Sequence, residues 1–266
     1  MRSRRNRRLF VTGGNGFLGR HLVNADHGWE IIAPSSSALD IRRRDSVIEA
    51  ITSWKPQAVA HLAYRYDDRT MTTDGSHYVA EAAAACGARL VHLSTDVVFP
   101  GRPTPYREAD PTFPITDYGR MKADAETAVI AAAPTAVIVR TSLLYGTDHL
   151  GIPQLDVKRA VADGGFTFFT DEVRCPIHAG DLATIVAELA RRPEITGPLH
   201  VAGPSALSRA DFAVLIARWL GLNPNLITTG PRSGSAVNRP GVVVLDSSKA
   251  AALGLRARSP EAILGR

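Results

Sequence analysis

The stretch LFVTGGNGFLG, residues 9–19, decides the fold of this chain of 266 residues. Its first three residues are apolar and predict a buried β-strand, and the residues from Gly16 to Ala25 predict a helix. Gly13 allows a tight turn, Gly16 lets a phosphate approach the main chain, and Gly19 lets the helix pack closely on the strand. Because the free N–H groups of a helix N-terminus attract phosphates, this turn predicts a dinucleotide-binding site.

Short apolar runs and helical patterns alternate along the chain after this stretch. We predict strands at residues 29–33, 58–62, 89–93 and 136–139, and helices at residues 45–54, 79–86 and 118–132. Alternation of this kind is typical of a parallel sheet with helices on both faces. The sequence therefore predicts an α/β fold, a doubly wound parallel Rossmann sheet, with a dinucleotide-binding domain at residues 1–150.

The pattern is looser beyond residue 150. We predict strands at residues 166–169 and 199–201, and helices at residues 181–191 and 208–220. Ser208 with Asp211 resembles a capping box, and Pro260 after Ser259 is typical of a helix start. Since no long linker interrupts the sequence, we expect residues 151–266 to form mainly a small substrate-binding region.

Composition and charge exclude two classes of protein. No apolar run approaches the roughly 18 residues that a membrane-spanning helix needs, so an integral membrane protein is excluded. The net charge is +5, but five arginines lie within residues 1–8, so the rest of the chain is neutral overall. A nucleic-acid-binding protein needs a basic face across its folded domain, and the sequence shows none.

The compartment is predicted from the first residues and the cysteines. The basic start resembles a signal peptide, but glycine follows before an apolar segment of about seven residues has formed. We therefore expect a cytoplasmic protein. The two cysteines, Cys86 and Cys175, are too few for a disulfide framework and are expected to be free thiols. We predict no metal site.

Tyr118 and Lys122 are four residues apart on a predicted helix, so they project from one face. A lysine ammonium beside a phenol lowers the phenol's pKa and also binds a ribose hydroxyl. The tyrosine can then donate a proton to a carbonyl group. Behind a dinucleotide-binding turn, this pair favours a catalytic role over a surface pair that only stabilises the helix.

The window after the second strand, residues 33–37, bears on the choice of cofactor. It reads Ala-Pro-Ser-Ser-Ser and has no carboxylate before Asp40, whereas a site selective for NAD holds the ribose 2′-hydroxyl with an acid there. The serine hydroxyls can bind a 2′-phosphate, and Arg20 or the arginines at 42–44 can supply positive charge. We therefore predict NADP, with a site that accepts both NADP and NAD as the alternative.

The fourth strand ends in the segment at residues 93–99, Leu-Ser-Thr-Asp-Val-Val-Phe. Ligands of open α/β sheets bind at the carboxyl ends of the strands, so a hydroxyl of Ser94 or Thr95 is expected to face the cleft. An ordinary strand end without a ligand is the alternative.

Together these residues resemble the extended short-chain dehydrogenase/reductase family, and in particular its dTDP-4-dehydrorhamnose reductase branch, which also contains sugar-nucleotide-binding relatives. The resemblance covers nearly the whole chain. It rests on the glycine stretch, on Tyr118 with Lys122, and on the segments at residues 39–41, 94–99, 105–108, 140–146 and 180–183.

The resemblance implies a role for each residue of the site. Thr95 orients a keto oxygen, Tyr118 is the acid, and Lys122 supports it. The expected cofactor residues are Gly13, Asn15, Gly16, Phe17, Leu18, Gly19, Ser35, Ser36, Asp40, Ile41, Leu62, Ala63, Tyr64, Tyr118 and Lys122. The expected substrate residues are Ser94, Asp96, Val97 and Arg174, where Arg174 pairs either a substrate phosphate or Asp171 or Glu172.

The resemblance implies a reductase that transfers a hydride from NAD(P)H to a keto group, most simply on a nucleotide-activated 4-keto sugar or a related ketone. A sugar-nucleotide epimerase and a cofactor-binding regulatory subunit of another enzyme are the alternatives. A 4,6-dehydratase is disfavoured because Val97 stands where that chemistry places a glutamate. Leu143 replaces the usual tryptophan of the rhamnose enzymes, so the nucleotide stays open. The sequence also leaves a homodimer open.

Overall fold

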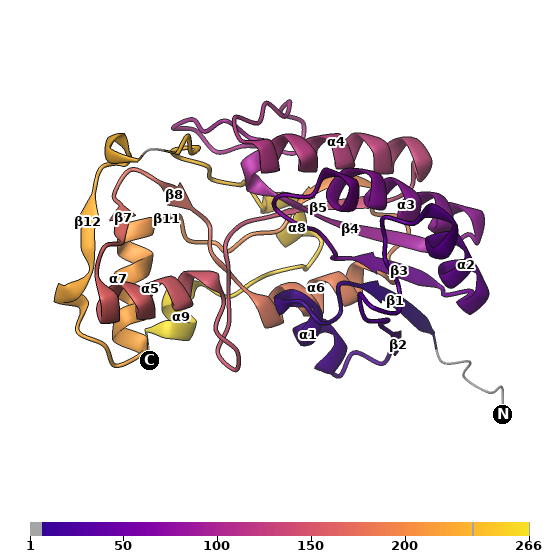
Figure 1. Cartoon of the computed structure of the whole chain (residues 1–266), viewed down its shortest axis with the longest axis horizontal. Coiled ribbons are helices and arrows are strands. Elements are labelled where there is room, and N and C mark those ends of the chain that lie inside the picture. The colour runs from indigo at the N-terminus through magenta and orange to yellow at the C-terminus, as the bar shows by residue number, and fades with distance from the viewer. Residues whose placement is uncertain (1–6, 236, 266) are drawn as a thin grey trace. The chain divides into compact units, whose positions relative to one another are not determined.

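The computed structural model describes residues 7–235 and 237–265 (Figure 1). Within this part of the chain, six strands form one sheet in the order β10-β5-β4-β3-β1-β2. Their bounds are β1 Arg8–Thr12, β2 Glu30–Ile32, β3 Ala58–His61, β4 Arg89–Thr95, β5 Val137–Thr141 and β10 Gly197–His200. β1 pairs in parallel with β2 and β3, and β3 pairs in parallel with β4. The predicted doubly wound Rossmann sheet is confirmed.

Helices cover both faces of this sheet. They are α1 Phe17–Asn24, α2 Arg44–Trp54, α3 Gly75–Ala85, α4 Asp117–Ala132 and α6 Ala179–Leu189, with a π-helical turn, η1 Thr70–Asp74, before α3. Figure 1 shows α2, α3 and α4 on one face, with α1 and α6 on the other. Side chains of β1, β3, β4, α2, α3 and α4 share one buried cluster, which includes Phe10, Val59 and Val129. Because both faces are covered, β3 and β4 are buried along nearly all of their length.

The second half of the chain contains shorter elements. Its helices are α5 Ile152–Asp163, α7 Arg209–Trp219, α8 Ser248–Ala252 and α9 Pro260–Leu264. Its strands are β6 Leu144–Tyr145, β7 Thr167–Phe169, β8 Val173–Arg174, β9 Ile177–His178, β11 Leu207–Ser208 and β12 Thr228–Gly230. They pair two by two, β6 with β9, β7 with β12 and β8 with β11. Its short 3-10 turns are η3 Pro224–Leu226 and η4 Arg232–Gly234, and a further one in the first half, η2 Asp96–Val98, directly follows β4.

Two predicted helix caps are present in this half. Ser208 is the N-cap of α7, and its Oγ accepts a hydrogen bond from the N–H of Asp211 at 2.9 Å. Ser259 caps α9 in the same way, with Pro260 as the first helical residue. These caps satisfy N–H groups that a helix leaves unpaired at its start. Helix α5 was not predicted from the sequence; it begins at Ile152 with two exposed apolar side chains, Ile152 and Leu155.

By packing, the chain forms two compact units. One comprises the described residues up to Ser94 together with Arg120–Val139 and Ala183–Leu199. The other comprises Thr95–Gly119, Arg140–Leu182 and the described residues from His200 onward. The chain passes from one unit to the other several times. The functional boundary at residue 150 therefore stays a prediction about cofactor and substrate binding, separate from these packing units.

None of the helices in the described part of the chain combines the length and apolar character that a bilayer span requires. Cys86 and Cys175 are free thiols. Of the basic first residues, those before Arg7 lie outside the described residues.

Candidate active site

The turn between β1 and α1 and the first turn of α1 each require a glycine. Gly13 has φ +75°, and a Cβ built on it would lie 2.8 Å from the main-chain nitrogen of Ala63. At Gly19 a Cβ would overlap the carbonyl oxygen of Gly13. The N-terminus of α1 has no side-chain cap, so its first N–H groups remain available to an anion.

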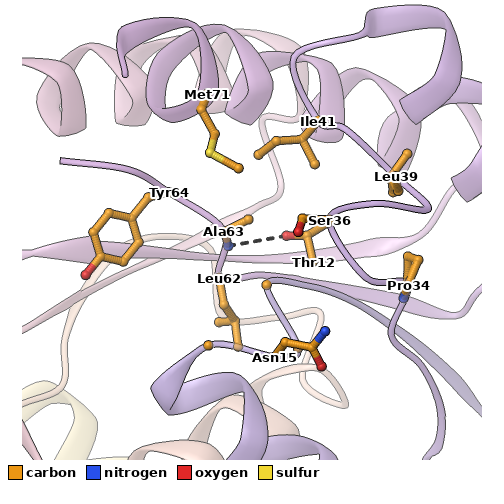
Figure 2. Close-up of a pocket in the computed structure, with 13 residues that line it drawn as sticks. Thr12, Asn15, Pro34, Ser36, Leu39, Ile41, Leu62, Ala63, Tyr64 and Met71 are labelled. Carbon is orange, nitrogen blue, oxygen red and sulfur yellow. Dashed lines mark hydrogen bonds between the residues drawn. The ribbon is translucent and has the colours of Figure 1, made fainter. Parts of the chain in front are cut away.

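A pocket of about 340 Å³ opens beside this turn (Figure 2). It is lined by Thr12, Gly13, Gly14, Asn15, Gly16, Pro34, Ser36, Leu39, Ile41, Leu62, Ala63, Tyr64 and Met71. Figure 2 shows Ile41 and Met71 on one side of the pocket and Asn15 on the other. The apolar side suits a flat aromatic ring and the glycine side suits phosphates, which are the two ends of half a dinucleotide.

The segment after β2, which contributes Ser36 and Leu39 to the pocket lining, also carries hydroxyls and a paired carboxylate. Ser35 and Ser37 share a hydrogen bond of 2.8 Å between their Oγ atoms. Arg42 donates to both carboxylate oxygens of Asp40, at 2.8 Å from Nη2 and 2.9 Å from Nε. These hydrogen bonds hold the pKa of Asp40 below its usual value. Asp68 lies 3.5 Å from Nη1 of the same arginine.

Helix α4 holds Tyr118, Lys122 and Glu126 on one face, one helical turn apart. Lys122 is only 3% exposed, and its Nζ donates to the carbonyl oxygen of Leu93 at 2.5 Å. Burial lowers the pKa of this lysine to about 8. Its Nζ lies 5.9 Å from the ring centre of Tyr64, a residue that lines the pocket. The predicted lysine therefore lies next to the pocket wall.

Two buried histidines lie near this lysine. Nδ1 of His61 is 2.6 Å from Oγ1 of Thr12, and its Nε2 is 3.0 Å from Oγ of Ser76. The ring of His92 lies 5.2 Å from that of His61, and neither of its nitrogens has a hydrogen-bond partner among the described residues. Burial first and the charge of Lys122 second lower the pKa of both histidines, that of His61 to about 3.

The polar side chains at the end of β4 form hydrogen bonds with other residues of the protein. Ser94 is buried, and its Oγ donates to Oε1 of Glu126 at 2.5 Å. Thr95 is the N-cap of η2, with its Oγ1 3.4 Å from the N–H of Val97. Asp96 is also buried, and it accepts a hydrogen bond from Oγ of Ser142 at 2.6 Å. Burial raises the pKa of Asp96.

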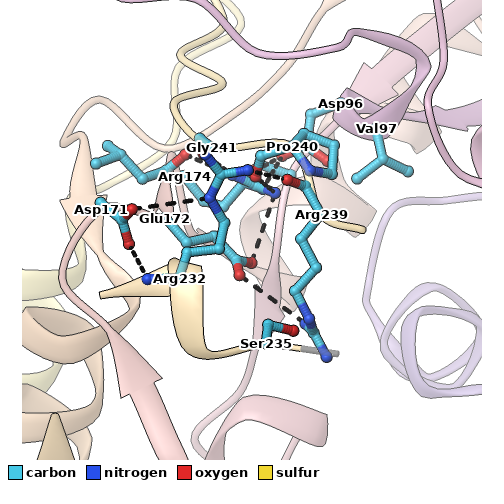
Figure 3. Close-up of polar contacts among 12 residues, drawn as sticks. Asp96, Val97, Asp171, Glu172, Arg174, Arg232, Ser235, Arg239, Pro240 and Gly241 are labelled. Atoms are coloured by element: carbon cyan, nitrogen blue, oxygen red, sulfur yellow. Dashed lines mark hydrogen bonds and ion pairs between the residues drawn. The ribbon is translucent and has the colours of Figure 1, made fainter. Parts of the chain in front are cut away.

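Arg174 lies at the centre of a buried polar cluster (Figure 3). Its guanidinium donates to the carbonyl oxygens of Gly241 at 2.6 Å and Pro240 at 2.8 Å. It also lies 3.5 Å from Glu172 and 3.7 Å from Asp96. Of the two alternatives for Arg174, these contacts favour the internal ion pair, since the residue is only 3% exposed. The other predicted partner, Asp171, instead accepts from the N–H of Arg232 at 2.6 Å.

Residues 7–261 match the model of a protein family described as the RmlD substrate binding domain. The chain belongs to this family. The predicted resemblance to the dTDP-4-dehydrorhamnose reductase branch is thus confirmed.

Two curated relatives and one solved structure show what this chain is similar to. A protein of Streptomyces antibioticus, named "Probable dTDP-4,6-dihydroxy-2-methyloxan-3-one 4-ketoreductase", is 34% identical over 247 residues, 88% of this chain and 83% of its own. "Methionine adenosyltransferase 2 subunit beta" of Pongo abelii is 30% identical over 285 residues, 96% of this chain and 85% of its own. The crystal structure of dTDP-4-dehydrorhamnose reductase from Bacillus anthracis str. Ames, in complex with NADP, matches with a TM-score of 0.87 at 26% identity, covering 98% of each chain.

The pocket beside the glycine turn brings together about half of the predicted cofactor residues. Those that line it are Gly13, Asn15, Gly16, Ser36, Ile41, Leu62, Ala63 and Tyr64. Phe17, Leu18, Gly19, Ser35, Asp40, Tyr118 and Lys122 are outside its lining. The site roles assigned to these residues stay predictions.

Five lining residues were not among the predicted ones. Thr12 and Gly14 belong to the glycine stretch itself, and Pro34 and Leu39 adjoin predicted positions, so sequence reasoning could have included them. Met71 had no such signal, because it lies in the π-helical turn η1 that precedes α3. The buried pair His61 and His92 was missed because each looks like an ordinary strand residue in sequence.

Proposed function

We propose that this chain is an NADPH-dependent reductase that converts the 4-keto group of a dTDP-activated sugar to an alcohol. The observation that carries the proposal is the buried Lys122, one turn after Tyr118 on α4 and 5.9 Å from the Tyr64 ring at the pocket wall, in a chain of the RmlD family. Both the 4-ketoreductase of S. antibioticus and the B. anthracis enzyme are named for reactions on dTDP sugars.

The pocket fits a nicotinamide dinucleotide. The cradle formed by Gly13 and Gly19 keeps its close main-chain packing only because both lack a Cβ, and the uncapped start of α1 offers N–H groups to a pyrophosphate there. Ile41 and Met71 supply an apolar surface for a base. When bound, the reduced cofactor supplies a hydride to the carbonyl carbon of the substrate.

The chain's own residues supply the proton and the orientation. Tyr118 donates its phenolic proton to the carbonyl oxygen, so that hydride and proton together give the alcohol. The ammonium of Lys122 favours the phenolate that remains. Thr95, at the carboxyl end of β4, orients the keto oxygen, and we assign Asp96 and Val97, which follow it in η2, to substrate binding. We assign substrate binding mainly to residues 151–266.

NADPH is preferred over NADH because the end of β2 offers hydroxyls and no free carboxylate. Ser36 lines the pocket, and the carboxylate nearest in sequence, Asp40, is held by Arg42. A 2′-phosphate therefore meets donors without a like charge. The B. anthracis structure contains NADP.

A second function is favoured by one relative. The Pongo abelii protein is named as a subunit of methionine adenosyltransferase, although it is as similar to this chain as several reductases are. In that role the chain would bind the cofactor and a partner enzyme without reducing a sugar.

One experiment separates these functions. Purified protein is mixed with NADPH and, in turn, dTDP-, UDP- and GDP-linked 4-keto-6-deoxy sugars, and loss of the reduced cofactor is followed by absorbance. We expect turnover with the dTDP sugar and slower turnover when NADH replaces NADPH. No turnover with any sugar, together with stoichiometric capture of a methionine adenosyltransferase, would establish the subunit role instead.

A further inference from the structure

Lys122 carries a charge into the interior of the protein. Its side chain is 3% exposed, and the carbonyl of Leu93 accepts one of its three possible hydrogen bonds. An ammonium group that is buried without a counter-charge is costly, and it loses its proton instead. The fold must therefore supply a negative group if this lysine is to stay protonated.

Glu126 is the buried acid on the same face of α4. It lies one helical turn after Lys122 and is 4% exposed. Ser94 donates its hydroxyl proton to Oε1 of this glutamate at 2.5 Å. Because Ser94 directly follows Leu93 in β4, the end of one strand binds both members: its main chain accepts from the lysine, and its side chain donates to the glutamate.

The other titratable groups near Lys122 do not replace this acid. His61 on β3 and His92 on β4 both have lowered pKa values, to which the lysine charge contributes, so both are neutral at pH 7. Tyr64 presents an aromatic ring at 5.9 Å, and Tyr118 lies one turn earlier in α4. Glu126 is the charged group that raises the pKa of Lys122, opposing the burial that lowers it to about 8.

We propose that Glu126, held in place by Ser94, is a positioning residue that keeps Lys122 protonated beside the dinucleotide pocket. The inference rests on the proposed function only in its kinetic consequence, since Lys122 is there assigned to support Tyr118. Ser94 thereby acts through Glu126 and Lys122, whereas the sequence had suggested that it contacts substrate.

The substitution Glu126→Gln tests this proposal directly. Glutamine keeps the size of the side chain and an oxygen that accepts from Ser94, but it removes the charge. The pKa of Lys122 then falls further below about 8. Because the lysine is protonated only below its pKa, the alkaline limb of the turnover profile moves to lower pH, by about one unit. The variant should approach the parent near pH 6 and fall furthest behind it near pH 8.

A direct titration of the lysine needs no substrate. The chain contains four lysines, Lys55, Lys122, Lys158 and Lys249, so their side-chain nitrogens can be labelled and followed individually by NMR. Asp124→Asn is the matched control, because it removes the same charge from the same helix at a half-exposed site paired with Arg69. We expect Lys122 to titrate at lower pH in Glu126→Gln and at its parental pH in Asp124→Asn.

Ser94→Ala is the second variant, in case Glu126→Gln does not fold. It keeps the carboxylate but removes its donor, and it should shift the lysine titration in the same direction by a smaller amount. An unchanged Lys122 titration in the folded variants overturns the proposal. If the pKa of Lys122 falls but the alkaline limb of the turnover profile does not move, the positioning role is overturned. If the parent reduces none of the keto sugars, the proposed function fails, and the lysine titration still decides the inference.

Discussion

The hydroxyl group of Tyr118 is the assigned proton donor, and it is the only group that distinguishes this side chain from phenylalanine. Tyr118→Phe keeps the packing of the side chain and removes the proton that the carbonyl oxygen receives. We expect turnover to fall by about 10²- to 10⁴-fold, with cofactor affinity little changed. The measurement is steady-state turnover on a substrate of the parent enzyme, together with a fluorescence titration of NADPH.

Tyr78→Phe serves as the control for this change, because Tyr78 packs against the core from α3 and has no assigned role in the reaction. It should leave turnover within a factor of about two. Near-parental turnover in Tyr118→Phe would show that another group supplies the proton.

A carboxylate at the end of β2 should reverse the choice of cofactor. Ser35 lies three residues after this strand and next to Ser36, which lines the pocket. Ser35→Asp adds an acceptor for the ribose 2′-hydroxyl and a negative charge that repels a 2′-phosphate. We expect the ratio of NADPH to NADH affinity to fall by at least tenfold, an effect of about 1.4 kcal/mol.

The control for this charge is Ser53→Asp, on an exposed position of α2. It changes the net charge equally and should leave the affinity ratio as it is. Parental affinities in Ser35→Asp would place the 2′-phosphate elsewhere in the pocket.

At the scale of elements, the contact between α1 and the turn that precedes it sets the geometry of the cradle. Gly19→Ala would place a methyl group on the carbonyl oxygen of Gly13, which is main chain and cannot rotate away. The helix must then shift, at a cost of about 1–3 kcal/mol in unfolding free energy. Because the shift also moves the first N–H groups of α1, NADPH affinity should fall as well.

Gly230→Ala is the matched control. A methyl group there would meet only Cγ2 of Thr167 at 3.4 Å, an ordinary contact. Denaturant unfolding of both variants gives the comparison, and equal losses for the two would contradict the close packing at Gly19.

At the scale of the whole molecule, the buried histidines make stability depend on pH. The folded state holds the pKa of His61 at about 3 and that of His92 well below 6.5. Between these pKa values and pH 6.5, the unfolded chain therefore binds more protons than the folded chain does. The contribution of the two neutral histidines to the unfolding free energy is fully present above about pH 6.5. Below that pH it is lost, by about 1.4 kcal/mol per pH unit for each histidine. The substitution His92→Leu removes one of the two groups that take up a proton on unfolding.

We therefore expect His92→Leu to halve the joint contribution of His61 and His92 to the slope of unfolding free energy between pH 6 and pH 4.5. Its stability near pH 7 should equal or exceed that of the parent, since His92 has two ring nitrogens without a partner in the described structure. His149→Gln, at an exposed loop position, is the control. A slope as steep as the parental one would mean that His92 is protonated in the folded state.

The sequence predicts some parts of the site better than others. The cradle for the phosphates was predicted because its residues are consecutive and each glycine has a local steric reason. The pair Tyr118 and Lys122 was predicted because one helix sets its spacing. Met71, His61 and His92 were missed, because they reach the pocket or the lysine from separate elements.

The sequence by itself determined the alternation of strands and helices in the first half of the chain, the Rossmann sheet, the glycine turn and the family, since all of these depend on local pattern and short spacing. Only the tertiary structure decided what Ser94, Arg174 and Glu126 contact. A polar side chain near a strand end looks the same in sequence whether it faces a ligand or a partner within the fold. Burial decides between these, because an interior polar group must bind a group that the chain brings from elsewhere, and long-range packing chooses that group.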